Sequence, residues 1–115
     1  MSRLEILGEL VAERRLVLAC ADGAVLDVVV RFGRPVPMDG GNSLADDCWC
    51  SVQVVVGAAP RAVRAIGGVD AMQALQLAIV AADDELALIE GELSGKLAWQ
   101  GGGVYARLAS RPDLR

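Results

Sequence analysis

The stretch DAMQALQLAIVAADDELALIEGELSG, residues 70–95, has the clearest secondary-structure pattern of this chain. Its apolar residues recur at alternating spacings of three and four, which is the period of one face of an α-helix. Asp70 is a suitable N-cap, and Gln73 stands in the capping-box position. Gly95 is a natural terminator, and Gly91 is an earlier candidate end. The sequence predicts a helix of about six turns, and its buried stripe comprises Met72, Leu75, Ile79, Ala82, Leu86, Ile89 and Leu93.

The polar residues of this helix predict its exposed side. Gln76, Asp83 and Glu90 stand seven residues apart and mark a solvated side. Asp83, Asp84 and Glu85 are consecutive, so their side chains point in directions about 100° apart and cannot converge as a catalytic pair. We therefore expect an acidic, solvated helix face.

The residues before the helix alternate with a period of two, which predicts strands. Residues 14–20 and 25–32 each place apolar side chains on one face, and they flank the turn residues Asp22 and Gly23. This pattern indicates an antiparallel hairpin with one buried face. Residues 33–37 contain two prolines and end its ladder, because proline has no amide hydrogen to donate.

Three further strands complete the predicted sheet. A strand at 47–56 follows the polar loop at 38–47, and a short strand at 96–100 follows the helix. Residues 61–66, before the helix, are expected to form another short strand, with an irregular segment as the alternative. The sequence thus predicts an α+β fold: an antiparallel sheet of four to five strands with one long helix packed on one face.

The composition is that of a globular domain. Hydrophobic residues make up 54% of the chain and charged residues 23%. The 115 residues suit one domain, which we expect over residues 1–115 with loosely ordered ends at 1–9 and 104–115. The net charge of −4 and the lack of a basic run argue against a nucleic-acid partner.

The sequence indicates a cytoplasmic protein. No apolar segment approaches the about 20 residues of a membrane span, so we expect no membrane partner. Glu5 and Glu9 interrupt the apolar N-terminus, which is unlike an export signal. The three cysteines are an odd count and would stay reduced in the cytoplasm. The dominance of Arg over Lys, with many Ala, Val and Gly residues, is typical of a GC-rich bacterial genome.

Cys48 and Cys50 flank Trp49 in the segment DDCWCSVQV, residues 46–54. Residues two apart on a strand share a face, so both thiols join a row of valines, where buried cysteine behaves as a small apolar residue. A zinc site needs four ligands, and without histidine it would require Cys20 and an aspartate as well. A disulfide between same-face neighbours would be strained. We expect both thiols in the core, with metal and redox roles as the alternatives.

The sequence predicts no catalytic, cofactor or metal site. The chain has no histidine, which removes the commonest general base. The glycines at 101–103 are not followed by the Lys and Ser or Thr of a phosphate loop. The loop at 38–47 lacks the spacing of a calcium-binding loop. We expect a non-enzymatic protein, although a carboxylate and an arginine could act without histidine.

One sheet face remains after the other packs on the helix. It carries a tryptophan among valines and charged residues, and aromatics and Arg are enriched at protein interfaces. We expect a protein partner or a second copy of the chain to bind there, as a homodimer in the latter case. The open alternative is that Trp99 and Tyr105 fold over this face. The expected interface residues are Val17, Val25, Val29, Arg31, Trp49, Gln53 and Val55.

A second functional hypothesis uses the crevice between sheet and helix. A small molecule or an anion would bind there, or a minor enzymatic activity would reside there. Arg34, Arg64 and Asp70 are the residues expected to line this pocket. The helix N-terminus attracts anions, but Asp70 already occupies that position and repels them.

Several short motifs follow one another along residues 14–100. They are Arg14-Arg15-Leu16, Gly33-Arg34-Pro35, Trp49-Cys50, Gly67-Gly68-Val69-Asp70, Gln73-Ala74-Leu75-Gln76-Leu77-Ala78, and Leu97 with Trp99. Their order resembles that of a family of small bacterial domains of unknown function. The resemblance implies no catalytic residues, and bacterial proteins of this size often serve as accessory or immunity proteins, so we expect such a role by association.

Overall fold

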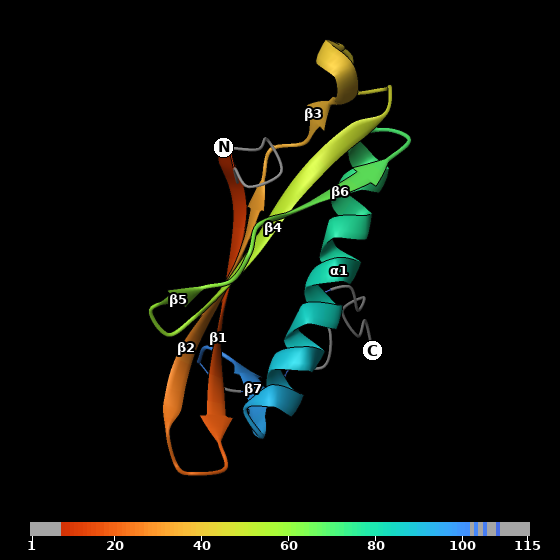
Figure 1. Cartoon of the computed structure of the whole chain (residues 1–115). Helices are drawn as coiled ribbons and strands as arrows, with labels where there is room; N and C mark the ends of the chain where they lie inside the picture. The colour runs from red at the N-terminus through yellow and green to blue at the C-terminus, as the bar shows by residue number, and fades with distance from the viewer. Residues whose placement is uncertain (1–7, 102, 104, 106–107, 109–115) are drawn as a thin grey trace.

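A computed structural model describes residues 8–101, 103, 105 and 108 of the chain. In this part of the chain, an antiparallel sheet forms one layer and a long α-helix lies along one side of it (Figure 1). The predicted α+β fold is confirmed. The expectation of loose order at 1–9 and 104–115 falls mainly on residues outside the described part.

The sheet has five strand positions, with β2 in the middle. Val52 of β4 pairs with Phe32 of β2 on one edge and with Arg64 of β6 on the other. β3 continues the edge of β2, β5 lies on the edge of β6, and β1 and β7 extend the sheet beyond β2. The described strands are β1 (Leu10–Cys20), β2 (Val25–Gly33), β3 (Val36–Pro37), β4 (Cys48–Val56), β5 (Ala59–Pro60), β6 (Arg64–Gly68) and β7 (Gly95–Trp99).

Seven strands fill these five positions in the described chain, slightly more strands than predicted. The difference comes from β3 and β5, which have two residues each. The β1–β2 ladder ends at Gly33, within the predicted stop at 33–37, and Val36 and Pro37 then pair with Trp49 and Cys48 of β4. Proline is tolerated there because the pairing ends with it.

The β1–β2 hairpin turns as predicted but is longer than its apolar pattern. The Asp22 carboxylate accepts a hydrogen bond from the amide of Ala24 at 2.8 Å, and Gly23 has a φ of 92°, which glycine adopts without strain. β1 begins at Leu10, before the predicted start at residue 14. Its first residues are exposed and have no alternating pattern, so only backbone pairing with β2 defines them.

β6 also differs from its predicted range. It spans Arg64–Gly68, whereas the prediction was 61–66. The shift arises because Gly67 and Gly68 continue the pairing with Trp49 and Cys48. Glycine has low strand propensity, so sequence reasoning placed the end of the strand before them.

The helix α1 (Ala71–Glu92) begins as predicted and ends slightly differently. The Asp70 carboxylate accepts from the amide of Gln73 at 2.8 Å, and the side-chain oxygen of Gln73 accepts from the amide of Val69 at 2.9 Å. At the other end Ser94, rather than Gly95, adopts a positive φ, of 48°. The chain thus turns one residue before the predicted terminator.

The buried side of α1 is narrower than the predicted stripe. Ala74, Ala78, Ala82, Leu86 and Ile89 form its buried line on the sheet. Met72 and Leu93, at the ends of the predicted stripe, are 66% and 40% exposed, so their assignment to the core was wrong. Small alanines let the helix approach the sheet closely, which leaves the larger residues at the flanks.

The polar side of α1 also requires a correction. Asp83 is only 6% exposed, although it was predicted to mark the solvated side. Its carboxylate accepts from the amide of Leu108 at 2.6 Å and from the hydroxyl of Tyr105. Tyr105 and Leu108, which lie 22 and 25 residues further along the chain, therefore cover the Asp83 carboxylate.

The core lies between the sheet and α1. It contains Leu16 and Leu18 of β1, Val28 and Val30 of β2 and the alternate residues of β4. Across the described residues, α1 included, no helix is long and apolar enough to cross a membrane.

Candidate functional site

The side chains predicted to form an interface do share one surface. We call it the outer face, the sheet surface opposite α1. Strand pairing sets Val17 opposite Asp27, Val29 opposite Val55, and Arg31 opposite Gln53. The residues between them point into the core, as the strict burial alternation along β4 shows. The predicted interface residues Val17, Val25, Val29, Arg31, Trp49, Gln53 and Val55 therefore all lie on the outer face.

Valines form the apolar centre of the outer face. Val29 is 9% exposed, because it sits on β2 between β1 and β4 and its neighbours enclose it. Val17 and Val55 are half-buried, and Val25 near the hairpin turn is 66% exposed. The outer face therefore exposes little apolar surface at Val29 and more toward the hairpin turn.

Charged side chains of both signs surround these valines. The Glu13 carboxylate lies 3.2 Å from the Arg15 guanidinium and 3.3 Å from that of Arg31. Asp27 is exposed on the same face. The mixture of apolar and charged groups is what a protein interface typically presents.

Trp49 lies toward the other end of the outer face and packs against the chain itself. A Cβ atom on Gly67 would stand 3.2 Å from Cζ3 of Trp49 and 3.0 Å from Cε of Met38. The indole therefore lies directly over the bare backbone of β6, beside Met38. Trp49 is half-buried, so it extends the outer face but does not form its centre.

Trp99 and Tyr105 lie on the helix side of the sheet. Trp99 pairs with the core residue Leu16, and its ring contacts the Tyr105 ring edge-on at 5.4 Å and the Arg14 guanidinium at 4.8 Å. The Tyr105 hydroxyl donates to Asp83 of α1. The alternative in which these two residues cover the outer face is therefore not what the structure shows.

The three residues of the predicted pocket do not meet. Arg34 is exposed and lies 3.4 Å from Glu9, and Arg64 lies 3.9 Å from Glu85 of α1. Asp70 caps the helix start. Asp70 and Glu85 are 15 residues apart, which is about 22 Å along a helix. Arg64 and Asp70 therefore cannot act on one small ligand.

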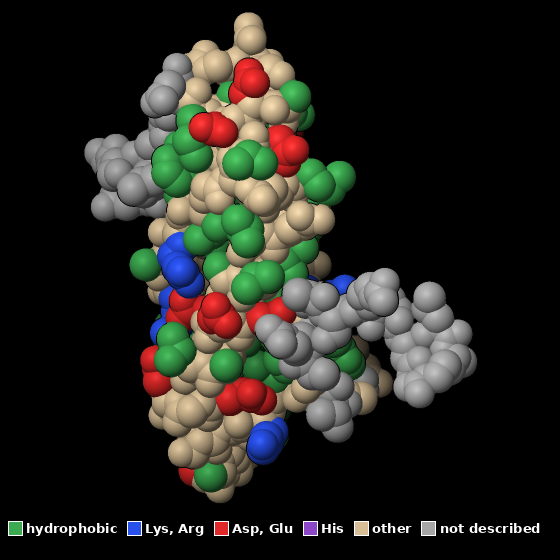
Figure 2. All heavy atoms as spheres, turned by 90° about the vertical axis from the view of Figure 1, so that its right-hand side faces the viewer, with side chains coloured by type: hydrophobic (Ala, Val, Ile, Leu, Met, Phe, Trp, Pro, Cys, Tyr) green, Lys and Arg blue, Asp and Glu red, His purple; other side chains and the backbone are tan. Residues whose placement is uncertain are grey.

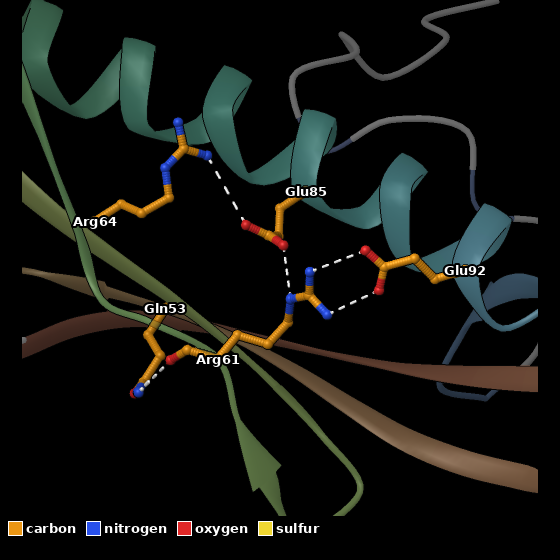
Figure 3. Close-up of polar contacts among 5 residues, drawn as sticks. All are labelled: Gln53, Arg61, Arg64, Glu85 and Glu92. Carbon is orange, nitrogen blue, oxygen red and sulfur yellow. Dashed lines mark hydrogen bonds and ion pairs between the residues drawn. The ribbon is translucent and has the colours of Figure 1, made fainter.

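The crevice instead holds an ion-pair network that the sequence did not reveal. Arg61 donates to Glu85 at 2.6 Å and to both oxygens of Glu92 at 3.1 and 3.4 Å, while its carbonyl accepts from Gln53 (Figure 3). The hydrogen bond to Glu92, together with that to Glu85, raises the pKa of Arg61. The seven-residue spacing of Glu85 and Glu92 was the available signal, because it places both on one side of the helix.

This network leaves little space for a ligand. The recess beside it, between β4 and α1, has a volume of about 10 Å³, enough for about one water molecule. Arg61 and Arg64 together balance the charges of Glu85 and Glu92. The arrangement is therefore that of a brace between the β5–β6 segment and α1.

An open depression lies at the β3 end of the sheet. Its volume is about 400 Å³, and it is lined by Met38, Gly41, Ala45, Asp46, Asp47 and Val69. Burial raises the pKa of the nearby Cys48 thiol, and the negative charges of Asp70, Asp46 and Asp47 raise it further.

The cysteines Cys48 and Cys50 belong to the core. Cys48 donates to the carbonyl of Asp46 at 3.1 Å and Cys50 to that of Gly33 at 3.4 Å. Burial raises the pKa of Cys50 to about 11, so its reactive thiolate is scarce at neutral pH. Cys20, Cys48 and Cys50 are free thiols, and the described residues contain no group of three or more potential metal ligands.

Fold and surface together define a class: a two-layer α+β domain that leaves one face of its sheet without a helix in the described chain. Comparison with known families places it more narrowly. The family model DUF6968, described as a domain of unknown function, matches residues 12–108, and the chain belongs to this family. The resemblance to a small family of domains of unknown function is thereby confirmed. Searches of the curated proteins and of the solved structures return no match.

Proposed function

We propose that this chain is a non-enzymatic protein-interaction module of the bacterial cytoplasm, of accessory or immunity type, that binds its partner through the outer face. One observation carries the proposal. The outer face joins a valine centre to arginines and carboxylates, while α1, Trp99 and Tyr105 all lie on the other side of the sheet. Val25 is 66% exposed and Val17 and Val55 are half-buried among these polar groups, and exposed apolar surface rimmed by polar groups favours a binding role.

The crevice between the sheet and α1 supports this choice. The Arg61 network spans the sheet–helix crevice, and the recess beside it has room for about one water molecule. The alternative of a small-molecule site built from Arg34, Arg64 and Asp70 has no converging groups to support it.

Site-specific photo-cross-linking in the producing cell tests the proposal. Val25 is replaced by benzoylphenylalanine, which places the probe on the outer face, and Val80 is replaced in a matched variant. Val80 is also an exposed valine, but it lies on α1. We expect a discrete cross-linked species from the Val25 probe and none from the Val80 probe.

Equal cross-linking from both positions, or none from Val25, would contradict the proposal. The mass of the cross-linked species identifies the partner as the same chain or as another protein.

A further inference from the structure

We propose that the partner of the outer face is a second copy of this chain, related by a twofold axis that crosses β2 at Val29. The inference rests on the proposed function, because it names the occupant of the same surface. In this dimer Arg31 of each copy lies opposite Asp27 of the other. Three features of the outer face carry the inference: its area, its charge and its register.

The area of the outer face matches that of a stable dimer. Five strand positions spaced about 4.8 Å apart span about 24 Å, and a nine-residue strand such as β2 or β4 is about 30 Å long. The face is therefore about 700 Å², close to the about 800 Å² that each partner contributes to a typical specific complex. A second copy presents a surface of the same shape and size.

Charge favours self-association through the outer face and disfavours it elsewhere. The helix sequence holds five carboxylates and no basic residue, and acidic side chains are visible among apolar ones on that side of the molecule (Figure 2). Two copies would repel one another there. The outer face instead has Glu13 and Asp27 against Arg15, Arg31 and Lys96.

The register of β2 makes the outer face complementary to itself. Arg31 and Asp27 stand two residues on either side of Val29, and all three point to the same face. Packed sheets keep their strands roughly aligned. A twofold axis crossing β2 at Val29 then exchanges the two positions, so that each copy contributes an arginine and a carboxylate to two equivalent pairs. Glu13 lies 3.2 Å from Arg15 and 3.3 Å from Arg31 of its own chain. One carboxylate thus faces two guanidinium groups, and the remaining positive charge is available to Asp27 of the other copy.

Sedimentation of the purified protein gives the first test. A monomer has a mass of 12.0 kDa, and we expect about twice that mass at concentrations well above the micromolar range, where an interface of this size associates. A mass that stays at 12.0 kDa under these conditions would overturn the inference.

Charge reversal tests the docking geometry. In Asp27→Arg, both intermolecular pairs become Arg facing Arg, and in Arg31→Asp, both become Asp facing Asp. We expect each variant alone to have a dissociation constant at least about tenfold higher than the wild type. An equimolar mixture of the two variants restores both pairs, so it should form a heterodimer with near wild-type affinity.

The mixture also serves as the folding control, because misfolded chains would not regain association. Asp84→Arg, a reversal of an exposed carboxylate on α1, should leave the dimer intact. Failure of the mixture to associate, or unchanged association of the single variants, would overturn the Arg31–Asp27 arrangement. A monomeric protein whose Val25 probe still cross-links to a different protein would overturn this inference and leave the proposed function standing.

Discussion

Gly67 and Gly68 serve opposite faces of the same strand. A Cβ on Gly68 would lie 2.7 Å from Cα of Ala74, on the helix side, and one on Gly67 would meet Trp49 on the outer face. The missing side chain of Gly67 lets the Trp49 indole lie on β6. The missing side chain of Gly68 lets the first turn of α1 lie on the other side of the same strand. The glycine pair in the motif before the helix is thus explained by two close approaches and not by a turn.

Replacing Gly68 with alanine should therefore be costly. The new methyl group meets backbone atoms, which cannot rotate away as a side chain can, so we expect a loss of about 3 kcal/mol in the free energy of unfolding. Gly91→Ala is the matched control within α1. A Cβ at that position meets nothing within 4 Å, so this change should stabilise the protein by about 0.5–1 kcal/mol.

Urea denaturation of both variants measures the difference. Equal effects of the two substitutions would contradict the close approach of α1 to Gly68.

The buried thiol of Cys50 should make stability fall at alkaline pH. Its pKa is raised by burial from the ordinary 9.0 to about 11, so the unfolded chain loses this proton first. The stabilisation is complete below pH 9 and is lost as the pH rises toward 11. We expect the free energy of unfolding to fall by up to about 1.4 kcal/mol per pH unit more in the wild type than in Cys50→Ala.

Denaturation at several pH values between 9 and 11 checks this, with Cys20→Ala as the control that keeps Cys50. An unchanged slope in Cys50→Ala would show that this thiol does not titrate differently in the two states.

At the scale of elements, Arg61 ties the segment before β6 to α1. Its guanidinium contacts Glu85, which is largely buried, and binds Glu92 through two nitrogens. Two-pronged arginine–carboxylate pairs are stronger than ordinary surface pairs. We expect Arg61→Ala to lower the free energy of unfolding by about 1–2 kcal/mol.

Arg34→Ala is the matched control, because Arg34 and Glu9 are both exposed and such pairs contribute about 0.5 kcal/mol or less. Chemical denaturation at low and high salt checks the comparison. If Arg61→Ala and Arg34→Ala lowered the free energy of unfolding equally, the Arg61 network would not stabilise the contact between α1 and the segment before β6.

A second contact between elements joins α1 to Tyr105. The hydroxyl of Tyr105 donates to Asp83, while its ring packs edge-on against Trp99 of β7. Burial and the hydrogen bond to Asp83 raise the pKa of Tyr105. Tyr105→Phe removes only the hydroxyl and should cost about 1 kcal/mol, and Tyr105→Leu should cost more because it also removes the aromatic contact.

Thermal denaturation of the two variants separates these contributions. A Phe variant as stable as the wild type would mean that the hydroxyl contributes nothing to this contact.

At the scale of the whole molecule, the two sides of the sheet differ in chemistry. The helix side encloses the core, and its exposed surface is acidic (Figure 2). The outer face has charges of both signs around Val29. A net charge of −4 keeps copies apart in most orientations, so association through the outer face is the orientation that this charge distribution favours.

The sequence by itself determined the features that depend on local period. Alternation with period two placed the β1–β2 hairpin and separated Cys48 and Cys50 from Trp49, because successive strand residues point to opposite faces. Spacings of three and four placed α1, and Asp70 marked its start through a contact only three residues long. These features depend on contacts between residues close in the sequence, so a short stretch of sequence is enough to predict them.

Contacts between residues far apart in the sequence are visible only in the folded chain. Arg61 and Glu92 are 31 residues apart and Asp83 and Tyr105 are 22 apart, and no local pattern pairs them. The exposure of Met72 and the burial of Asp83 likewise follow from how closely α1 approaches β6 and from what packs on its flank. Such contacts depend on the packing of whole elements, which a period of two or 3.6 residues does not encode.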